Sequence, residues 1–307
     1  MDVWVLGRIA YDLFAAEIGK PLPECATFTR HLGGSSANIA VGLARQGLKV
    51  GMIGCVGDDL FADYLTGFLE KERVDAKFVR RAKGYGTQLC VGEVVPPFRQ
   101  VFYRHKPADT QLAIGDDELK EIAGARMFVT NGTSLSDEPS RRSTLDALAA
   151  AKKAKVTTVF DVDYRESSWP SPQEAGSYAR SALANIDVVI ANEEEVSVLT
   201  GQSDSAKAAR SVLAGGPSLL VRKLGAAGVE AHTRDGSVRV APMEVTVVST
   251  VGAGDGFAAG FLAAWLQKRD LPDCLRRGNV AAAIVVGKVS CSDVMPTAAE
   301  IEARLPS

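Results

Sequence analysis

Short apolar strand patterns alternate with longer helical patterns along most of this 307-residue chain. The strand patterns cover 3–6, 50–56, 127–130, 157–161, 188–191 and 219–222. The helical patterns cover 37–46, 61–70, 140–153, 172–184 and 192–199, with a last one over about 273–286. Such an alternation predicts a parallel sheet, because parallel strands need crossover connections that are usually helices. We therefore predict the α/β class, with a doubly wound, mostly parallel sheet and helices on both faces.

One segment departs from this alternation. Residues 86–95 and 100–104 are two strand patterns joined by Pro96-Pro97, which indicates a hairpin outside the main sheet. We predict a single domain over 1–307 that carries a small β lid built from about 13–32 and 75–111. A lid of this kind can close over a bound ligand.

The composition favours a folded enzyme over a nucleic-acid or membrane-surface protein. Apolar residues make up 46% of the chain, and the formal net charge is −2 with only short basic pairs. A basic face for phosphate backbones or anionic lipids is therefore not expected. The five cysteines form no close pairs and the three histidines are scattered, so neither a disulfide framework nor a zinc site is predicted. With a start that lacks a cationic leader, these features favour the cytoplasm.

A glycine-rich stretch near the C-terminal end is the strongest candidate for chemistry. A β-branched run over 245–248 is followed by Gly252-Ala253-Gly254-Asp255 and by a helical pattern that begins at about residue 254. A strand, a glycine turn and a helix start form an anion site, because the first N–H groups of a helix lack intrahelical partners and carry the positive end of its dipole. Asp255 is then either a catalytic base beside a phosphate or a residue that caps the helix.

The same stretch has a membrane alternative, since residues 245–266 hold a single charge. The central Asp and the three glycines within five residues argue against it, because an Asp in the middle of a bilayer costs about 3 kcal/mol. We therefore favour a strand, a turn and a helix.

Further candidates lie at strand ends or in the first turns of helices. Asn38 follows a glycine pair and starts a helix, where its amide can meet a polar ligand. Asp12 lies shortly after the first strand and by itself is more simply a turn residue. The segment 161–165 ends a strand at the edge where open α/β sheets bind ligands. The acidic turn 192–195 is explained by the helix dipole alone, and Arg104 on the hairpin either pairs with an anion or stays solvated.

The order of these motifs resembles that of the ribokinase-like (pfkB) sugar kinases. Gly-Gly-x-x-x-Asn begins at 33, Asp-x-x-x-Arg at 161, Asn-x-x-Glu at 192, Gly-x-x-Gly at 225 and Gly-Ala-Gly-Asp at 252. The resemblance covers essentially the full chain. It implies an ATP-dependent carbohydrate kinase with a β lid, with the sugar beneath the lid and ATP beside the C-terminal turns.

The resemblance also implies a role for each matching residue. Asp255 is the base that takes the proton of the acceptor hydroxyl, and the N–H groups of Gly252, Ala253 and Gly254 hold the transferred γ-phosphoryl group. The helix dipole would lower the pKa of this base, but it can still act late in a loose transition state. The sugar contacts are Asp12, Gly33, Gly34 and Asn38. The residues for ATP are Asn192, Lys223, Gly225, Gly228 and Asn279, and Glu195 helps to order Mg²⁺ indirectly.

The substrate is a finer question. Tyr103 and Arg104 on the lid and Arg165 after a strand supply two cations, which suit a sugar-acid carboxylate because Arg pairs with carboxylates through parallel hydrogen bonds. Segments 102–109, 161–165 and 290–297 resemble the 5-dehydro-2-deoxygluconokinases of inositol breakdown. The first two of these segments also resemble 2-keto-3-deoxygluconate kinases. Kinases of fructose, ribose or a nucleoside are further alternatives.

One departure from the family pattern and two rival classes of function complete the prediction. Many family members carry an Asp six residues before the base, where it helps to hold a monovalent cation, and this chain has Ser249 there, which puts potassium activation in doubt. No Gly-x-Gly-x-x-Gly follows the first strand, which disfavours a nicotinamide-dependent oxidoreductase. A non-catalytic sugar or nucleotide sensor would have lost the base or the glycines. Partners are expected to be a sugar acid and ATP, without nucleic acid or membrane, in a homodimer that forms through the lid.

Overall fold

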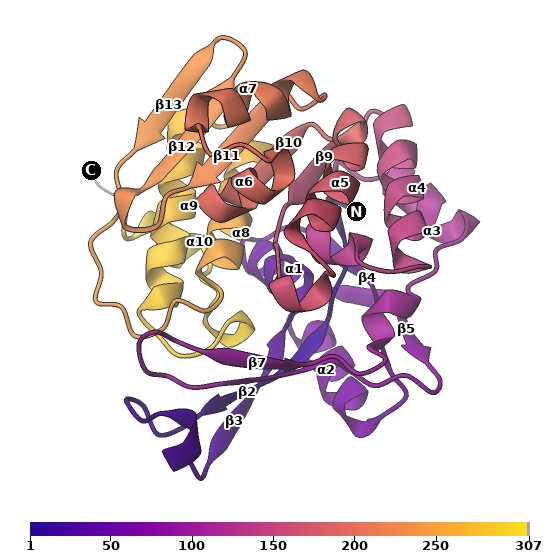
Figure 1. Ribbon diagram of the computed structural model, residues 1–307, viewed down its shortest axis with the longest axis vertical. Helices are drawn as coiled ribbons and strands as arrows, with labels where there is room; N and C mark the ends of the chain where they lie inside the picture. The colour runs from indigo at the N-terminus through magenta and orange to yellow at the C-terminus, as the bar shows by residue number, and fades with distance from the viewer. Residues whose placement is uncertain (306–307) are drawn as a thin grey trace.

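The chain folds around one large sheet, as the computed structural model of residues 1–305 shows (Figure 1). This nine-stranded sheet has the order β13-β12-β11-β10-β9-β8-β1-β4-β5. Its strands are β1 (Val3–Leu6), β4 (Val50–Gly57), β5 (Asp75–Ala82), β8 (Met127–Asn131), β9 (Thr157–Asp161), β10 (Val188–Asn192), β11 (Leu219–Lys223), β12 (Val229–Thr233) and β13 (Gly236–Val240). All neighbouring strands from β11 to β5 run parallel, and the last two join antiparallel. The predicted fold class is confirmed.

Strand β1 marks the point where the order of the sheet reverses. It pairs with β4 on one side and with β8 on the other. In open α/β sheets, ligands bind beyond the carboxyl ends of the strands at such a switch point. The segments that follow β1, β8, β9, β10 and β11 are therefore the positions from which a site can be built.

Helices cover both faces of the sheet, as alternating strand side chains require. Val3 and Val5 enter one hydrophobic core and Trp4 and Leu6 enter the other. The first core is covered by α1 (Ser35–Arg45), α2 (Leu60–Lys71), α8 (Ala253–Leu266) and α9 (Leu271–Val286). The second is covered by α3 (Asp116–Ala123), α4 (Ser140–Lys153), α5 (Pro172–Ala182), α6 (Glu193–Thr200) and α7 (Ser205–Ala214). A short α10 (Ala298–Glu302) packs on α9.

The lid is a separate four-stranded sheet at one end of the molecule (Figure 1). Its order is β3-β2-β6-β7, built from β2 (Ala10–Ala15), β3 (Phe28–Gly33), β6 (Leu89–Gly92) and β7 (Gln100–Tyr103). The predicted lid range that began at about 75 is too wide, because residues 75–82 form β5 and pair with β4 in the main sheet. The single-domain assignment over 1–307 stays a prediction, and its last two residues lie outside the described range.

The β-branched run before the glycine turn is not a strand. Residues 245–248 are irregular, and the N–H groups of Val248 and Ser249 donate to the Val286 carbonyl, at 2.8 and 3.1 Å. Two exposed valines, Val245 and Val247, show that the run lacks a sheet neighbour to cover it. The helix after the turn spans only Ala253–Leu266. Across the described residues, no helix has both the length and the apolar character needed to cross a bilayer.

Candidate active site

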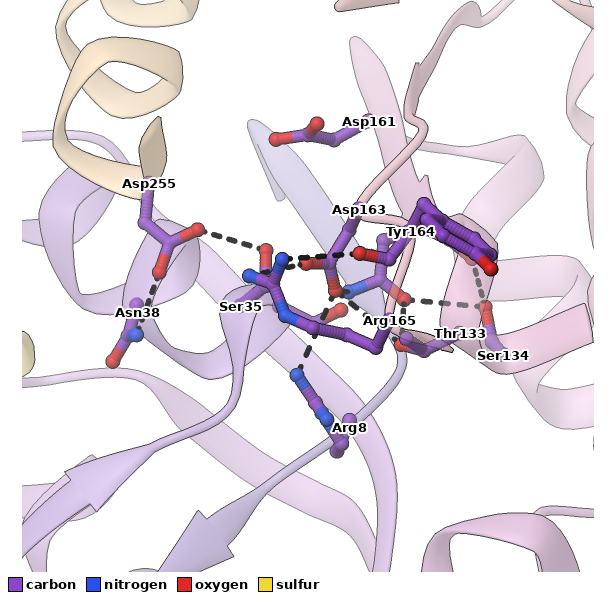
Figure 2. Close-up of polar contacts among 12 residues, drawn as sticks. Arg8, Ser35, Asn38, Thr133, Ser134, Asp161, Asp163, Tyr164, Arg165 and Asp255 are labelled. Carbon is purple, nitrogen blue, oxygen red and sulfur yellow. Dashed lines mark hydrogen bonds and ion pairs between the residues drawn. The ribbon is translucent and has the colours of Figure 1, made fainter. Parts of the chain in front are cut away.

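Asp255 lies in the first turn of α8 and is held by two donors from α1. The Ser35 hydroxyl donates to one carboxylate oxygen at 2.8 Å, and the Asn38 amide donates to the other at 2.7 Å. Gly252 precedes the helix with φ 77°, a left-handed conformation that glycine adopts without strain. Figure 2 shows the carboxylate above Asn38 and facing Ser35. Asp255 is thus fixed in orientation. At the same helix start the Ala253 N–H donates to the Thr250 carbonyl at 3.3 Å, and the Gly254 N–H is a donor without an acceptor in its own helix.

The pKa of Asp255 is raised above its ordinary value. Removal of the carboxylate from water is the largest cause, and the negative charge of Asp163 adds to it. The hydrogen bonds from Asn38 and Ser35 and the charge of Arg165 act in the opposite direction. The expectation of a dipole-lowered pKa was wrong, because burial and a neighbouring carboxylate outweigh the dipole. A raised pKa makes Asp255 a stronger proton acceptor.

A second hydrogen bond fixes the amide that holds Asp255. The fully buried Ser292 hydroxyl donates to Oδ1 of Asn38 at 2.6 Å. With its oxygen occupied in this way, the Asn38 amide turns its NH₂ group toward Asp255. Ser292 therefore acts as a positioning residue from the segment that follows α9.

Replacing Ser292 by Ala should lower kcat about 5- to 10-fold with little change in the KM for either substrate. The lost hydrogen bond contributes about 1 kcal/mol, and the freed amide no longer keeps one orientation toward the base. Steady-state kinetics measure this effect, and Ser181→Ala is the matched control, because the exposed Ser181 hydroxyl bonds only to the Tyr178 carbonyl in its own helix. An unchanged kcat in Ser292→Ala would remove Ser292 from the catalytic arrangement.

Asp12 lies on β2 of the lid and faces the end of β3. A Cβ atom added at Gly33 would lie 1.9 Å from Oδ2 of Asp12, so this carboxylate rests directly on the glycine backbone. Gly34 has φ 89°, and an added Cβ would lie 2.5 Å from the carbonyl oxygen of Arg8. Burial raises the pKa of Asp12 to about 7, against the opposing charges of Arg8 and His31. Gly33 thus makes room for the Asp12 side chain within the lid, and Gly34 allows the end of β3 to approach the backbone of Arg8.

Two arginines converge on the buried carboxylate of Asp163, which follows β9 (Figure 2). Arg165 pairs with it at 2.8 Å and Arg8 at 3.7 Å. Asn131 and Thr133 donate to the same carboxylate at 3.3 and 3.4 Å. Burial alone would lower the pKa of Arg165, but the larger effect of Asp163 raises it. The structure therefore places Arg165 beside Asp255, where it stays a charged group.

The two predicted lid residues, Arg104 and Tyr103, face different surroundings. The Arg104 guanidinium is buried, with Asp109 at 2.9 Å and a close hydrogen bond to Gln88. Tyr103 is 60% exposed. The register pairs Tyr103 with Leu89 and places Phe102 beside Cys90 and Asp12, on the other face of the lid sheet. The structure thus brings Arg104 toward the site and leaves Tyr103 on the opposite face from Asp12.

The predicted nucleotide residues gather beyond the ends of β10 and β11. Asn192 and Glu195 form a reciprocal cap on α6, with distances of 2.8 and 2.7 Å between side-chain oxygens and backbone nitrogens. The Lys223 ammonium lies 3.8 Å from Glu195 and 3.3 Å from Asp161. Burial raises the pKa of Asp161 to about 7, while Lys223 opposes this shift. A Cβ atom added at Gly254 would lie 3.3 Å from the Lys223 ammonium, so this cation borders the helix start of the anion site.

The remaining nucleotide candidates lie together on the same side. Gly225 and Gly228 have φ values of 56° and 92° in the turn between β11 and β12. A Cβ atom at Gly228 would lie 2.3 Å from the Val240 carbonyl oxygen. Asn279 on α9 donates to the Ala241 carbonyl at 2.8 Å, next to this turn. These residues form one wall, but the contacts among them are internal to the protein.

The residues in the described range hold no cluster of three or more His, Cys, Asp or Glu side chains that could bind a metal by themselves. Mg²⁺ is commonly bound by one or two carboxylates together with substrate phosphates. Glu195 and Asp161 would be the carboxylates near such an ion, since both lie beside Lys223 at the anion site. This donor set fits Mg²⁺ that arrives with a nucleotide and does not fit a resident metal.

Several site residues were missed by the sequence reasoning. Ser35 had a signal, because it follows the glycine pair directly. Arg8 had one as well, since a charged residue stands at the carboxyl end of a buried strand. Ser292, Gln88 and Asp109 had none, because their role depends on contacts with distant parts of the chain.

Comparison with known proteins agrees with this geometry. A sequence profile described as pfkB family carbohydrate kinase matches residues 1–298. A 5-dehydro-2-deoxygluconokinase from Clostridium perfringens is 37% identical, over 98% of this chain and 91% of that protein. Both matches extend over nearly the whole chain, so they include the lid, the strand ends and the glycine turn.

Solved structures show the same architecture. The crystal structure of a PfkB protein from Polaromonas sp. JS666 has a TM-score of 0.86 and 28% identity, and the match covers 99% of both chains. A fructokinase with bound ATP from Xylella fastidiosa has a TM-score of 0.87 and 25% identity, over 98% of this chain and 97% of that one. The doubly wound sheet with its lid is thus shared along the full length.

Proposed function

This chain belongs to the pfkB family of carbohydrate kinases, and on that premise we propose that it phosphorylates a primary hydroxyl of 5-dehydro-2-deoxygluconate. It is an ATP-dependent carbohydrate kinase. The observation that supports an acid as substrate is a cluster of three guanidiniums, Arg8, Arg104 and Arg165, of which Arg165 lies beside the base Asp255. The relatives named for this acid, at 36–37% identity, favour it over other sugar acids.

The proposed reaction uses Asp255 as base. One carboxylate oxygen accepts the proton of the substrate hydroxyl while that oxygen attacks the γ-phosphorus. The new O–P bond forms as the bond from the γ-phosphorus to the bridging oxygen breaks, and ADP leaves. The proton passes from Asp255 to solvent after product release. Ser35 and Asn38 keep the carboxylate in place, so proximity and orientation supply much of the rate enhancement.

The anion site at the start of α8 would stabilise the transferred group. The N–H groups that follow Gly252 and the Lys223 ammonium provide positive charge where negative charge accumulates. Mg²⁺ bound with ATP supplies further charge neutralisation, with Glu195 and Asn192 as the residues proposed to order it. Asn279 and the turn at Gly225 and Gly228 are proposed to border the adenine.

The sugar contacts remain those of the prediction. Asp12, Gly33, Gly34 and Asn38 surround the space between the lid and Asp255, and we propose that they contact the sugar hydroxyls. Tyr103 is also proposed as a lid contact of the substrate. Its side chain is exposed and lies on the face of the lid sheet opposite Asp12. Arg104 and Arg165 are proposed to face the acid end of the substrate.

A coupled assay of ADP formation across sugar acids and neutral sugars tests this proposal. We expect the highest kcat/KM for 5-dehydro-2-deoxygluconate, at least about tenfold above 2-keto-3-deoxygluconate, because a site built for one pattern of polar groups discriminates strongly against another. Fructose and ribose should rank lower still. A preference for a neutral sugar would refute the sugar-acid assignment, and tight sugar binding without ADP formation would identify a sensor.

Three further properties of the enzyme are also proposed, namely its response to potassium, its oligomeric state and its cellular compartment. Potassium activation should be weaker than in relatives with an Asp at position 249, since Ser249 is neutral and its hydroxyl accepts from the Val251 N–H at 3.3 Å.

A homodimer through the lid is supported by exposed apolar side chains there, at Ile18, Phe28 and Val101. The cytoplasm is supported by the need for ATP and by five free cysteines, which suit a reducing compartment.

A further inference from the structure

Arg8 is a buried cation at the centre of the fold. It lies just beyond the carboxyl end of β1, at the point where the strand order reverses. Only 4% of its surface is exposed. Its guanidinium faces the lid, with its carbon 5.9 Å from the centre of the Phe102 ring. A charge so deeply buried needs close partners, because an unpaired ion in the interior costs several kcal/mol.

The partners of Arg8 are more closely bound to other arginines. Its Nη2 lies 3.7 Å from Asp163, whose other oxygen pairs with Arg165 at 2.8 Å. Its Nη1 lies 3.5 Å from the side-chain oxygen of Gln88, which also accepts the close hydrogen bond from Arg104. Its Nε has no hydrogen-bond partner among residues 1–305. Arg8 is therefore the least satisfied of the three guanidiniums.

The close ion pairs of this cluster include fewer carboxylates than guanidiniums. Arg104 is paired with Asp109 and Arg165 with Asp163, so two carboxylates serve three guanidiniums. Burial lowers the pKa of Arg8, the charge of Asp163 opposes this shift, and the charges of Arg165 and Arg104 add to it. Asp12 and Asp255 are further buried carboxyls of the site, but among residues 1–305 neither forms a hydrogen bond or an ion pair with Arg8.

Two more buried polar atoms beside Arg8 lack partners in the described part of the chain. They are the amide nitrogen of Gln88, a donor, and Oδ1 of Asp109, an acceptor. Buried polar groups in proteins are normally hydrogen-bonded, and exceptions call for an explanation. Two free donors and one free acceptor suit an anion that also carries hydroxyl groups.

We propose that Arg8, with the Gln88 amide, binds the carboxylate of the sugar acid and sets the preference of the enzyme for acids over neutral sugars. This inference rests on the proposed function. Arg104 and Arg165 also face the acid end of the substrate, but a carboxylate of the protein already neutralises each of them. Arg8 is a specificity residue that the motif comparison did not identify.

The alternative is that Arg8 only supports Asp163. Asp163 would keep three partners without it, namely Arg165, Asn131 and Thr133. Loss of Arg8 therefore leaves no buried carboxylate unpaired. The two roles differ in the expected sign of the stability change, since removal of an unpaired buried charge stabilises a protein and removal of a supporting one destabilises it.

The test compares Arg8→Met with Arg277→Met, which removes a buried arginine that is well paired. Arg277 contacts Asp273 at 3.1 Å and Glu302 at 2.8 Å, far from the lid. For Arg8→Met we expect a urea midpoint at or above that of the wild type. We also expect a fall of about 10- to 100-fold in kcat/KM for 5-dehydro-2-deoxygluconate and of less than about 3-fold for fructose, since a charge-assisted pair contributes about 1.5–3 kcal/mol. Arg277→Met should lower the urea midpoint and keep the ratio of the two kcat/KM values.

Each other outcome counts against the inference. Equal losses for the acid and for fructose, or a midpoint lowered as in Arg277→Met, would assign Arg8 a structural role while the proposed function stands. A wild-type enzyme that phosphorylates fructose and no sugar acid would overturn the proposed function and the inference together. If Arg8→Met does not fold, Arg8→Lys keeps the charge but loses the planar donor fork, and it should lose about 10-fold for the acid alone. An unchanged ratio in Arg8→Lys would then overturn the inference.

Discussion

Replacing Asp255 by Asn should lower kcat by about 10³-fold or more while the affinity for ATP stays nearly unchanged. The substitution keeps the shape of the side chain but removes the proton acceptor, and general-base catalysis contributes about 10²–10⁴-fold. The expected loss is at the upper end because both donors to the carboxylate, Ser35 and Asn38, would face an amide that can accept only one of these hydrogen bonds well.

Single-turnover kinetics and ATP titration by calorimetry measure the two quantities separately. Asp235→Asn is the matched control, because Asp235 is exposed at the tip of the hairpin between β12 and β13 and should have no effect. Turnover of Asp255→Asn within about tenfold of the wild type would show that Asp255 is not the base.

The pH dependence follows from the same residue. Only the ionised carboxylate can accept the proton, and the pKa of Asp255 is raised by burial and by Asp163. The rate should therefore be full at alkaline pH and fall as the pH drops through a pKa above the ordinary value for Asp. A rate that stays constant well into acidic pH would contradict the raised pKa. The Asp255→Asn variant should lose this acid limb.

Replacing Asp163 by Ala should lower the free energy of unfolding by about 3–5 kcal/mol. The change removes the 2.8 Å partner of Arg165 and the nearest carboxylate of the buried Arg8, and a buried charge left without its partner is strongly destabilising. Asn131 and Thr133 would also lose their shared acceptor. Activity should fall with it, since the position of Arg165 beside Asp255 depends on this carboxylate.

Urea unfolding followed by circular dichroism measures this loss. The control is Asp146→Ala, because Asp146 pairs with Arg142 on the surface of α4 at 2.9 Å and has 49% of its side chain exposed. Such a surface pair contributes about 0.3–0.5 kcal/mol. Equal effects of the two substitutions would mean that the buried cluster around Asp163 contributes little to stability.

The elements of the main sheet were largely predictable because they rest on local patterns. The expected bounds of β9 and α4 match the structure at both ends. The hairpin of β6 and β7 was also expected, but the predicted lid range of 75–111 wrongly included β5. The run at 245–248 shows the limit of such reasoning, since β-branched residues favour a strand only where a neighbouring strand is present to pair with them.

The order of short motifs in the sequence by itself determined the family, the kinase chemistry and the identity of Asp255 as the candidate base. Each of these motifs spans only a few residues, and local backbone geometry sets the conformations that its glycines and helix-capping residues can adopt. Only the tertiary structure decided which partners orient the base and which arginine lacks one. Ser35 and Asn38 reach Asp255 across 220 and 217 positions of sequence, and Ser292 reaches Asn38 across 254. The incomplete pairing of Arg8 also depends on residues from both sheets. No local pattern in the sequence shows which arginine of the folded chain pairs with which carboxylate.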